Sequence, residues 1–152
     1  MRRRETSIRS VWSDTFLRAE QQHLLRLLLW AALSVLAATT IVAMITIRRV
    51  RSTLLSHFAL QMALWGIAIG SIAALEWHGL HIRDISGAAR VERLLWMNVG
   101  FDAGFIGMGC VLGLCGRILA RNAAAIGAGV GILVQGLGLL LIDLQFASMV
   151  SR

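Results

Sequence analysis

The stretch LLLWAALSVLAATTIVAMITI, residues 27–47, decides the fold because it contains twenty-one consecutive residues without a charge. As a helix it is about 31 Å long, since each residue rises by about 1.5 Å, and this length crosses the hydrocarbon layer of a membrane. Arginines flank it at Arg26 and Arg48. The stretch therefore predicts a transmembrane helix over about residues 24–47.

Three further apolar stretches follow, at about residues 54–75, 94–114 and 123–147. In lipid the backbone must satisfy its own hydrogen bonds, so each stretch is expected to be a helix. The connections at 48–51 and 117–122 are so short that the helices they join are expected to lie antiparallel. The sequence predicts an all-α membrane protein, an antiparallel four-transmembrane-helix bundle that forms a single membrane domain over residues 1–152.

The composition excludes an ordinary soluble domain, since 57% of the residues are hydrophobic and only 15% are charged. The net charge is +7, and all fifteen basic residues are arginines that lie between or beside the apolar stretches. This pattern is typical of membrane flanks and not of a nucleic-acid interface. Cys110 and Cys115 point about 140° apart on one predicted helix, so a disulfide between them is not expected.

The N-terminal arm, residues 1–23, is basic and contains a helical pattern of apolar positions. Its pattern residues are Trp12, Phe16, Ala19 and His23. We expect an interfacial amphipathic helix that lies on the membrane surface before the chain turns inward, and an arm that docks on a partner is the alternative. No small-residue cleavage site follows the first apolar stretch, so the sequence predicts an uncleaved first span.

The arginines also bear on the orientation of the protein. The two termini and the long middle connection share one side of the predicted bundle and carry ten arginines, against five in the two short loops. Counting basic residues predicts the N-terminus and C-terminus on the inside of the cytoplasmic membrane, N-in/C-in. The short loops contain no acids, which favours the opposite orientation.

Two carboxylates lie inside apolar stretches, Asp102 in MNVGFDAGFIGMG (97–109) and Asp143 in VQGLGLLLIDLQF (134–146). A charge at bilayer depth costs about 2.5 to 3.5 kcal/mol on insertion scales. With a turn near residue 120, antiparallel pairing puts Asp102 level with Gly136, and both carboxylates in the half that faces the N-terminus. The sequence predicts an intramembrane polar network of Arg26, Asn98, Asp102, Gln135 and Asp143. It either clamps the helices together or relays protons or ions.

Glycines lie on opposite faces of the last two stretches, and small residues let helices approach closely in lipid. In the third stretch Gly109 and Gly113 share a face with Asp102, whereas Gly100 and Gly104 lie on the opposite face. The fourth stretch aligns Gly129, Gly136 and Asp143, with Gly127, Gly131 and Gly138 facing away. The predicted helix-packing residues are Gly100, Gly104, Gly109, Gly113, Gly129 and Gly136. One face of each helix is expected to serve the bundle and the other a partner.

No catalytic triad, phosphate-binding loop or paired-cysteine metal motif is present, so catalysis, a metal site and a bound cofactor are not predicted. Ligation of a haem, pigment or metal by histidines is the alternative. The candidates are His23, His57, His78 and His81, yet EWHGLH (76–81) is not a ligand motif.

Three segments carry a resemblance to a known family: HFALQMALWGIAIG (57–70), ERLLWMNVGFDAGFIGMG (92–109) and GAGVGILVQGLGLLLIDL (127–144). Over about residues 56–147 the chain resembles an uncharacterised family of small bacterial four-helix integral membrane proteins. The matching positions are Asn98, Gly100, Asp102, Gly104, Gln135, Gly136 and Asp143. The departures are Phe101 for Leu, Phe105 for Tyr, Ile142 for an aromatic residue and Gly66 for Asn. The resemblance implies a fold and these polar positions, and no activity.

The sequence thus favours a non-catalytic accessory or stabilising subunit of a larger membrane complex, such as a respiratory or photosynthetic one. Its expected partners are other integral membrane proteins, a second copy of the chain, and lipid. The alternative is a proton-coupled or small-solute channel or carrier that uses Asp102 and Asp143.

Overall fold

The computed structural model describes the backbone of residues 2–81 and 85–150 and the side chains of residues 14–81 and 86–150. Its four helices are α1 (Arg2–Ile47), α2 (Thr53–His78), α3 (Ile85–Ile118) and α4 (Ala123–Val150). No strand occurs in these ranges. Each helix contains a segment that is long and apolar enough to cross a membrane. The all-helical class and the number of long apolar helices predicted from the sequence are therefore confirmed.

The two short connections end their helices in the same way. Arg49 and Arg121 have positive φ angles of 50° and 45°, the left-handed conformation that stops a helix at its C-terminus. The next helix then begins at a polar cap. The backbone N–H of Leu55 donates to Oγ of Ser52 ahead of α2, and the backbone N–H of Ala124 donates to Oδ1 of Asn122 ahead of α4.

Helix α1 differs from the sequence-based expectation because it is one continuous helix of 46 residues, about 69 Å long. The arm expected at residues 1–23 is its first half, and no turn separates it from the first span. The physical reason is visible in the sequence, since the chain has no proline and its first glycine is Gly66. The side chains of residues 1–13, Trp12 among them, lie outside the described part.

The first half of α1 packs against the end of α4. Phe16 and Leu24 are buried, and His23 stacks on Phe146 of α4. Of the positions that predicted a surface helix, His23 is therefore covered by the C-terminal helix, and Phe16 is buried within the protein.

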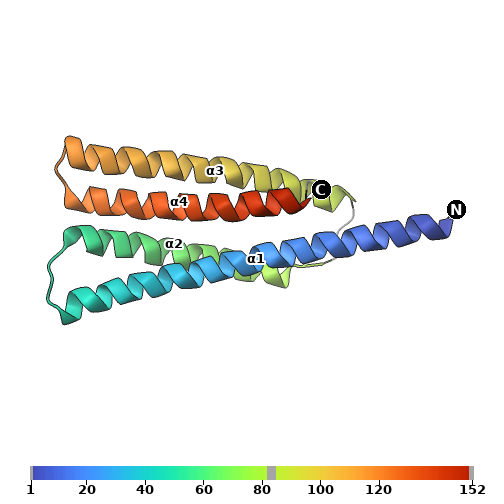
Figure 1. Cartoon of the computed structure of the whole chain (residues 1–152), viewed down its shortest axis with the longest axis horizontal. Coiled ribbons are helices and arrows are strands. Elements are labelled where there is room, and N and C mark those ends of the chain that lie inside the picture. Colours follow the sequence, from blue (N-terminus) through green and yellow to red (C-terminus); the bar gives the residue numbers. More distant parts are fainter. Residues whose placement is uncertain (1, 82–84, 151–152) are drawn as a thin grey trace.

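Helix α4 lies between α3 and the pair formed by α1 and α2 (Figure 1). Among the described residues, α3 packs extensively against α4 alone, whereas α2 packs against both α1 and α4. Because α4 has neighbours on two sides, its small residues are buried on both faces. Its buried residues are Gly127, Gly129, Gly131, Ile132, Gln135, Gly136, Gly138, Asp143 and Phe146.

Glycine contacts set the register between α3 and α4. A Cβ on Gly109 would lie 2.7 Å from the backbone nitrogen of Leu133, and one on Gly116 would lie 2.8 Å from Cβ of Ala125. A Cβ on Gly136 would lie 3.1 Å from the carbonyl oxygen of Asp102. Asp102 is therefore level with Gly136, where the position of the turn places it.

The second glycine face of α4 is also used inside the chain. A Cβ on Gly127, Gly131 or Gly138 would meet, respectively, the carbonyl of Leu54, the side chain of Gln61 and the indole of Trp30. Helix α4 consequently keeps no glycine face for a partner, contrary to the expectation for this helix. On α3, by contrast, a Cβ at the positions Gly100, Gly104, Gly107 and Gly113 would have no atom within 4 Å.

Candidate functional site

Polar side chains of all four helices gather in the half of the protein that lies opposite the two short connections. Here α2 and α4 end, α3 begins, and α1 passes beside them (Figure 1). The buried members include His23 on α1, Asp102 on α3 and Asp143 on α4. Glu76 of α2 and Asp102 are both close enough to Asp143 to interact with it electrostatically. The site is thus rich in acids, and its residues come from distant parts of the sequence.

His23 links α1 to α4 through both its ring face and its edge. Its ring stacks on Phe146 with centroids 4.4 Å apart and planes at 17°. Its Nε2 lies 3.7 Å from Oδ1 of Asp143, close enough for an ion pair when the imidazole is protonated. The edge of the imidazole therefore lies beside the Asp143 carboxyl group at the contact between the two helices.

Three buried polar atoms in this region have no hydrogen-bond partner among the described residues: Nδ1 of His23, Nη1 of Arg26 and Oδ2 of Asp102. Leaving a buried donor or acceptor unpaired costs about 1–3 kcal/mol, and more for a charged group. Such atoms are normally satisfied by water or by a ligand.

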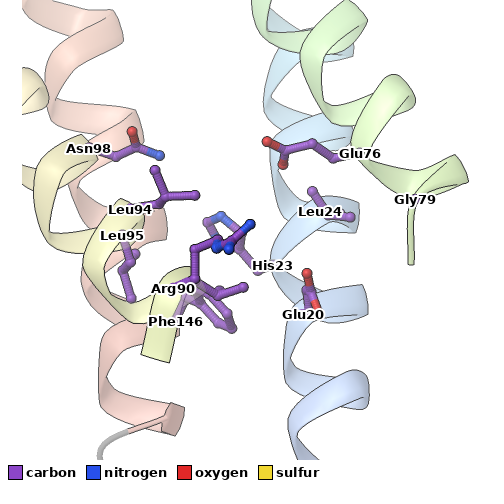
Figure 2. A pocket seen from close by; sticks show the side chains of 11 residues that line it. Glu20, His23, Leu24, Glu76, Gly79, Arg90, Leu94, Leu95, Asn98 and Phe146 are labelled. Atoms are coloured by element: carbon purple, nitrogen blue, oxygen red, sulfur yellow. The ribbon is translucent and has the colours of Figure 1, made fainter. Parts of the chain in front are cut away.

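One pocket opens at the end of the bundle, between the α1–α2 pair and the α3–α4 pair, and we name it the end pocket. Its volume is about 270 Å³. Figure 2 shows Glu76 and Asn98 on its two sides, with His23 and Arg90 between them. Its lining residues are Glu20, His23, Leu24, Glu76, Gly79, Arg90, Val91, Leu94, Leu95, Asn98 and Phe146. Charged groups of both signs therefore face this pocket.

A second pocket of about 350 Å³, the side pocket, adjoins the first at Asn98, which lines both. It contains the two carboxylates Asp102 and Asp143 in a largely apolar and aromatic wall. Its lining residues are Leu27, Trp65, Ile69, Ile72, Asn98, Phe101, Asp102, Phe105, Leu139 and Asp143. The two buried acids thus face a cavity instead of a packed helix interface.

Deeper in the bundle, Gln135 forms a separate group of hydrogen bonds. It accepts from the indole Nε1 of Trp30 at 2.8 Å, and its Nε2 donates to Oγ of Ser34 at 2.9 Å. The same Nε2 lies 3.3 Å from Sδ of Met62. Beyond this group lies an apolar cluster of Ala38, Ala59 and Met62 with Ala37, Ile41, Phe58, Ala63 and Val134 packed around it. Gln61 of α2, whose side chain packs beside Gly131, lies further toward the short connections than Gln135.

The structure divides the five residues of the predicted polar network. Asn98, Asp102 and Asp143 meet at the side pocket. Arg26 lies near His23, and its Nη1 is unpaired within the described part of the chain. Gln135 belongs instead to the deeper group.

The polar network predicted from the sequence did not include Trp30 and Ser34, the hydrogen-bond partners of Gln135. The signal was the spacing of 4, 3, 4 and 4 residues that puts His23, Leu27, Trp30, Ser34 and Ala38 on one face of α1. That spacing identifies a buried face, although it does not say which helix covers it.

The histidines proposed as cofactor ligands are spread over the bundle. Nδ1 of His57 lies 2.9 Å from the carbonyl of Thr53, and Nδ1 of His81 lies 2.7 Å from the carbonyl of Gly79. Among the described side chains, those of residues 14–81 and 86–150, no three of His, Cys, Asp or Glu are arranged to hold a metal ion.

Comparison with known proteins assigns most of the chain to a family. Residues 26–144 match the model of a family of unknown function, DUF6992. No curated protein and no solved structure matches the chain. The matched part includes the side pocket with both carboxylates, whereas His23 and Phe146 lie just outside it.

Proposed function

The chain belongs to DUF6992, a family of unknown function, and we propose that it is a non-catalytic membrane subunit that stabilises a larger complex by packing against another membrane protein. In this proposal the four helices cross the bacterial inner membrane as an antiparallel bundle, with both termini in the cytoplasm. The partner packs on the outer face of α3, defined by Gly100, Gly104 and Gly107.

The observation that carries the proposal is that no other described part of the chain packs against this outer face. All three glycines lack any atom within 4 Å of the Cβ position, whereas a Cβ on any of the five glycines of α4 would meet an atom at 3.0 Å or closer. Glycine inside a helix is about 1 kcal/mol less favourable than alanine. Within one chain, the outer face of α3 gains no contact that offsets this disadvantage. Small residues on a helix in lipid favour the close approach of another helix.

The position of α3 supports the same conclusion. Since α3 packs extensively on α4 alone among the described helices, most of its circumference is open to a neighbour. A partner helix on the outer face leaves the α3–α4 contact at Gly109 and Gly116 untouched.

Purification of the tagged full chain in mild detergent, followed by mass spectrometry, tests the proposal. We expect a stoichiometric membrane protein to co-purify, or the chain to be a dimer. Gly104→Leu is expected to reduce the recovered partner by about tenfold, because the leucine holds the two backbones apart. Ala68→Leu, at an exposed position of α2, is the matched control and should leave recovery unchanged. A monomer without a partner would contradict the proposal.

Disulfide crosslinking then distinguishes a second copy from a different protein. Cys110 and Cys115 are free and exposed, so both are first replaced by alanine. Gly104→Cys in that background is expected to form a homodimer under oxidation if the partner is a second copy. A crosslink to a protein of another mass identifies a heteromeric partner.

A second candidate function, a proton-coupled or small-solute carrier, is favoured by one observation. The carboxylates Asp102 and Asp143 are buried and face a pocket, and Oδ2 of Asp102 is unpaired within the described residues. For a solute to cross the bundle, the hydrogen bonds of Gln135 would have to break and the apolar cluster beyond them would have to separate. Proteoliposomes containing the parent chain should then show a flux that Asp102→Asn abolishes, and a parent without flux removes this candidate.

A further inference from the structure

The side pocket opens through the lateral surface of the bundle, between α2 and α3. These two helices are not packed extensively on each other, and α4 lies between them as the floor of the pocket. The rim residues Ile72 on α2 and Phe101 on α3 are 56% and 58% exposed. If the helices cross a membrane, a molecule dissolved in the lipid reaches this pocket without passing through water.

The interior of the pocket contains a carboxylate that lacks a partner. Asp102 is only 4% exposed, lines the pocket, and its Oδ2 has no hydrogen bond within the described part of the chain. Asp143 lines the same pocket, and Nε2 of His23 lies 3.7 Å from its Oδ1. A buried carboxylate is stabilised by a cation or a hydrogen-bond donor, and no described side chain supplies one to Oδ2 of Asp102.

The remaining wall is suited to an apolar body. Trp65 and Phe105 meet edge to face across α2 and α3, with ring centroids 4.6 Å apart and planes at 66°. Phe101 adds a third aromatic ring. Aromatic faces attract cations as well as apolar groups, and the volume of about 350 Å³ lies within the usual range for small-molecule sites.

We propose that the side pocket binds a lipophilic ammonium compound from the lipid phase. Its apolar body lies against Trp65, Phe101 and Phe105, and its positively charged nitrogen is held by the carboxyl groups of Asp102 and Asp143. An anion is disfavoured because it would face the carboxyl oxygens of two acids in a largely apolar pocket. This site is independent of the proposed partner surface, since Asp102 and Gly104 lie on opposite sides of α3.

Three naphthalene compounds of similar size test the proposal: 1-naphthylmethylammonium, 1-naphthylmethanol and 1-naphthoate. Their binding to the full chain is measured by calorimetry in detergent at neutral pH, after subtraction of their transfer into empty micelles. We expect saturable binding of the ammonium compound, binding of the alcohol that is weaker by about tenfold, and no saturable binding of the anion. Equal affinities for the ammonium compound and the alcohol would overturn the proposal.

Asp102→Asn keeps the size of the side chain and removes its charge. It is expected to weaken binding of the ammonium compound by about tenfold and to reduce its advantage over the alcohol. Unchanged ammonium binding by this variant contradicts the role of the carboxylate.

A second pair of variants serves if Asp102→Asn does not fold. Ile72→Trp closes the pocket from its exposed rim and should abolish binding. Ile67→Trp is the matched control, because Ile67 lies on the same helix, is 59% exposed and does not line the pocket. Equal binding by both variants overturns the proposal. The Gly104→Leu variant, which tests the partner surface, should bind the ammonium compound normally. The two proposals can therefore fail independently of each other.

Discussion

The indole Nε1 of Trp30 on α1 donates a 2.8 Å hydrogen bond to Oε1 of Gln135 on α4, joining residues 105 positions apart in the sequence. The same amide donates to Oγ of Ser34, so both ends of the Gln135 side chain are satisfied by α1. Trp30 also covers Gly138 one turn further along α4. These contacts make Gln135 the principal polar link between the first and last helices.

Gln135→Leu is therefore expected to destabilise the protein. The substitution leaves the N–H of Trp30 and the hydroxyl of Ser34 without their partner in a buried place, a loss of about 1–3 kcal/mol. The free energy of unfolding is measured by titration with dodecyl sulfate in mixed micelles, followed by circular dichroism. Gln145→Leu, at an exposed position of the same helix, is the control and should change the free energy by less than about 0.5 kcal/mol. Similar values for the two variants would show that the buried hydrogen bonds contribute nothing.

The stacked pair of His23 and Phe146 is expected to couple energetically. A double-mutant cycle with His23→Ala, Phe146→Ala and the combined variant should give an interaction free energy of about 0.5–1.5 kcal/mol, as for other stacked rings. The same unfolding titration supplies the four values. Strict additivity of the two single substitutions would mean that the rings do not meet in the folded protein.

Phe16→Ala distinguishes the continuous α1 of the structure from an arm lying in the membrane surface. Phe16 is buried in the structure, so its truncation should lower the free energy of unfolding by about 3 kcal/mol. An interfacial arm would lose membrane affinity instead, with little change in the stability of the bundle. Leu25→Ala removes an apolar side chain from a half-exposed position of the same helix and serves as the comparison.

The sequence predicts the helices well because the property that defines them is local. An uncharged run such as residues 27–47 has one stable conformation in lipid, and the turn near residue 120 fixes the register that brings Asp102 level with Gly136. The continuity of α1 was also predictable, since neither proline nor glycine occurs before Gly66. The prediction of a separate arm gave too much weight to amphipathic spacing, because packing against a neighbouring helix produces the same spacing.

The arrangement of the helices was not predictable in the same way. Periodicity identifies which residues share a face, but it does not say which helix covers that face. The pairing of Trp30 with Gln135 and the proximity of His23 to Asp143 join residues more than 100 positions apart in the sequence. The central position of α4 depends in addition on its contacts with α2 and α3. The side pocket has the same origin, because it exists only where α2 and α3 are kept apart by α4.

The two glycine faces of α3 should respond oppositely to alanine. At Gly109 a Cβ would lie 2.7 Å from the backbone nitrogen of Leu133 and 2.8 Å from the carbonyl oxygen of Gly129, so the helices must separate. Gly109→Ala is expected to lower the free energy of unfolding by about 1–3 kcal/mol. Gly104→Ala meets no atom within 4 Å and should raise it by as much as about 1 kcal/mol, because alanine is the better helix former. Measured on the isolated chain, a loss of stability at Gly104 equal to that at Gly109 would show that α3 is rotated from its position here. The outer face, and with it the proposed partner surface, would then lie inside the bundle.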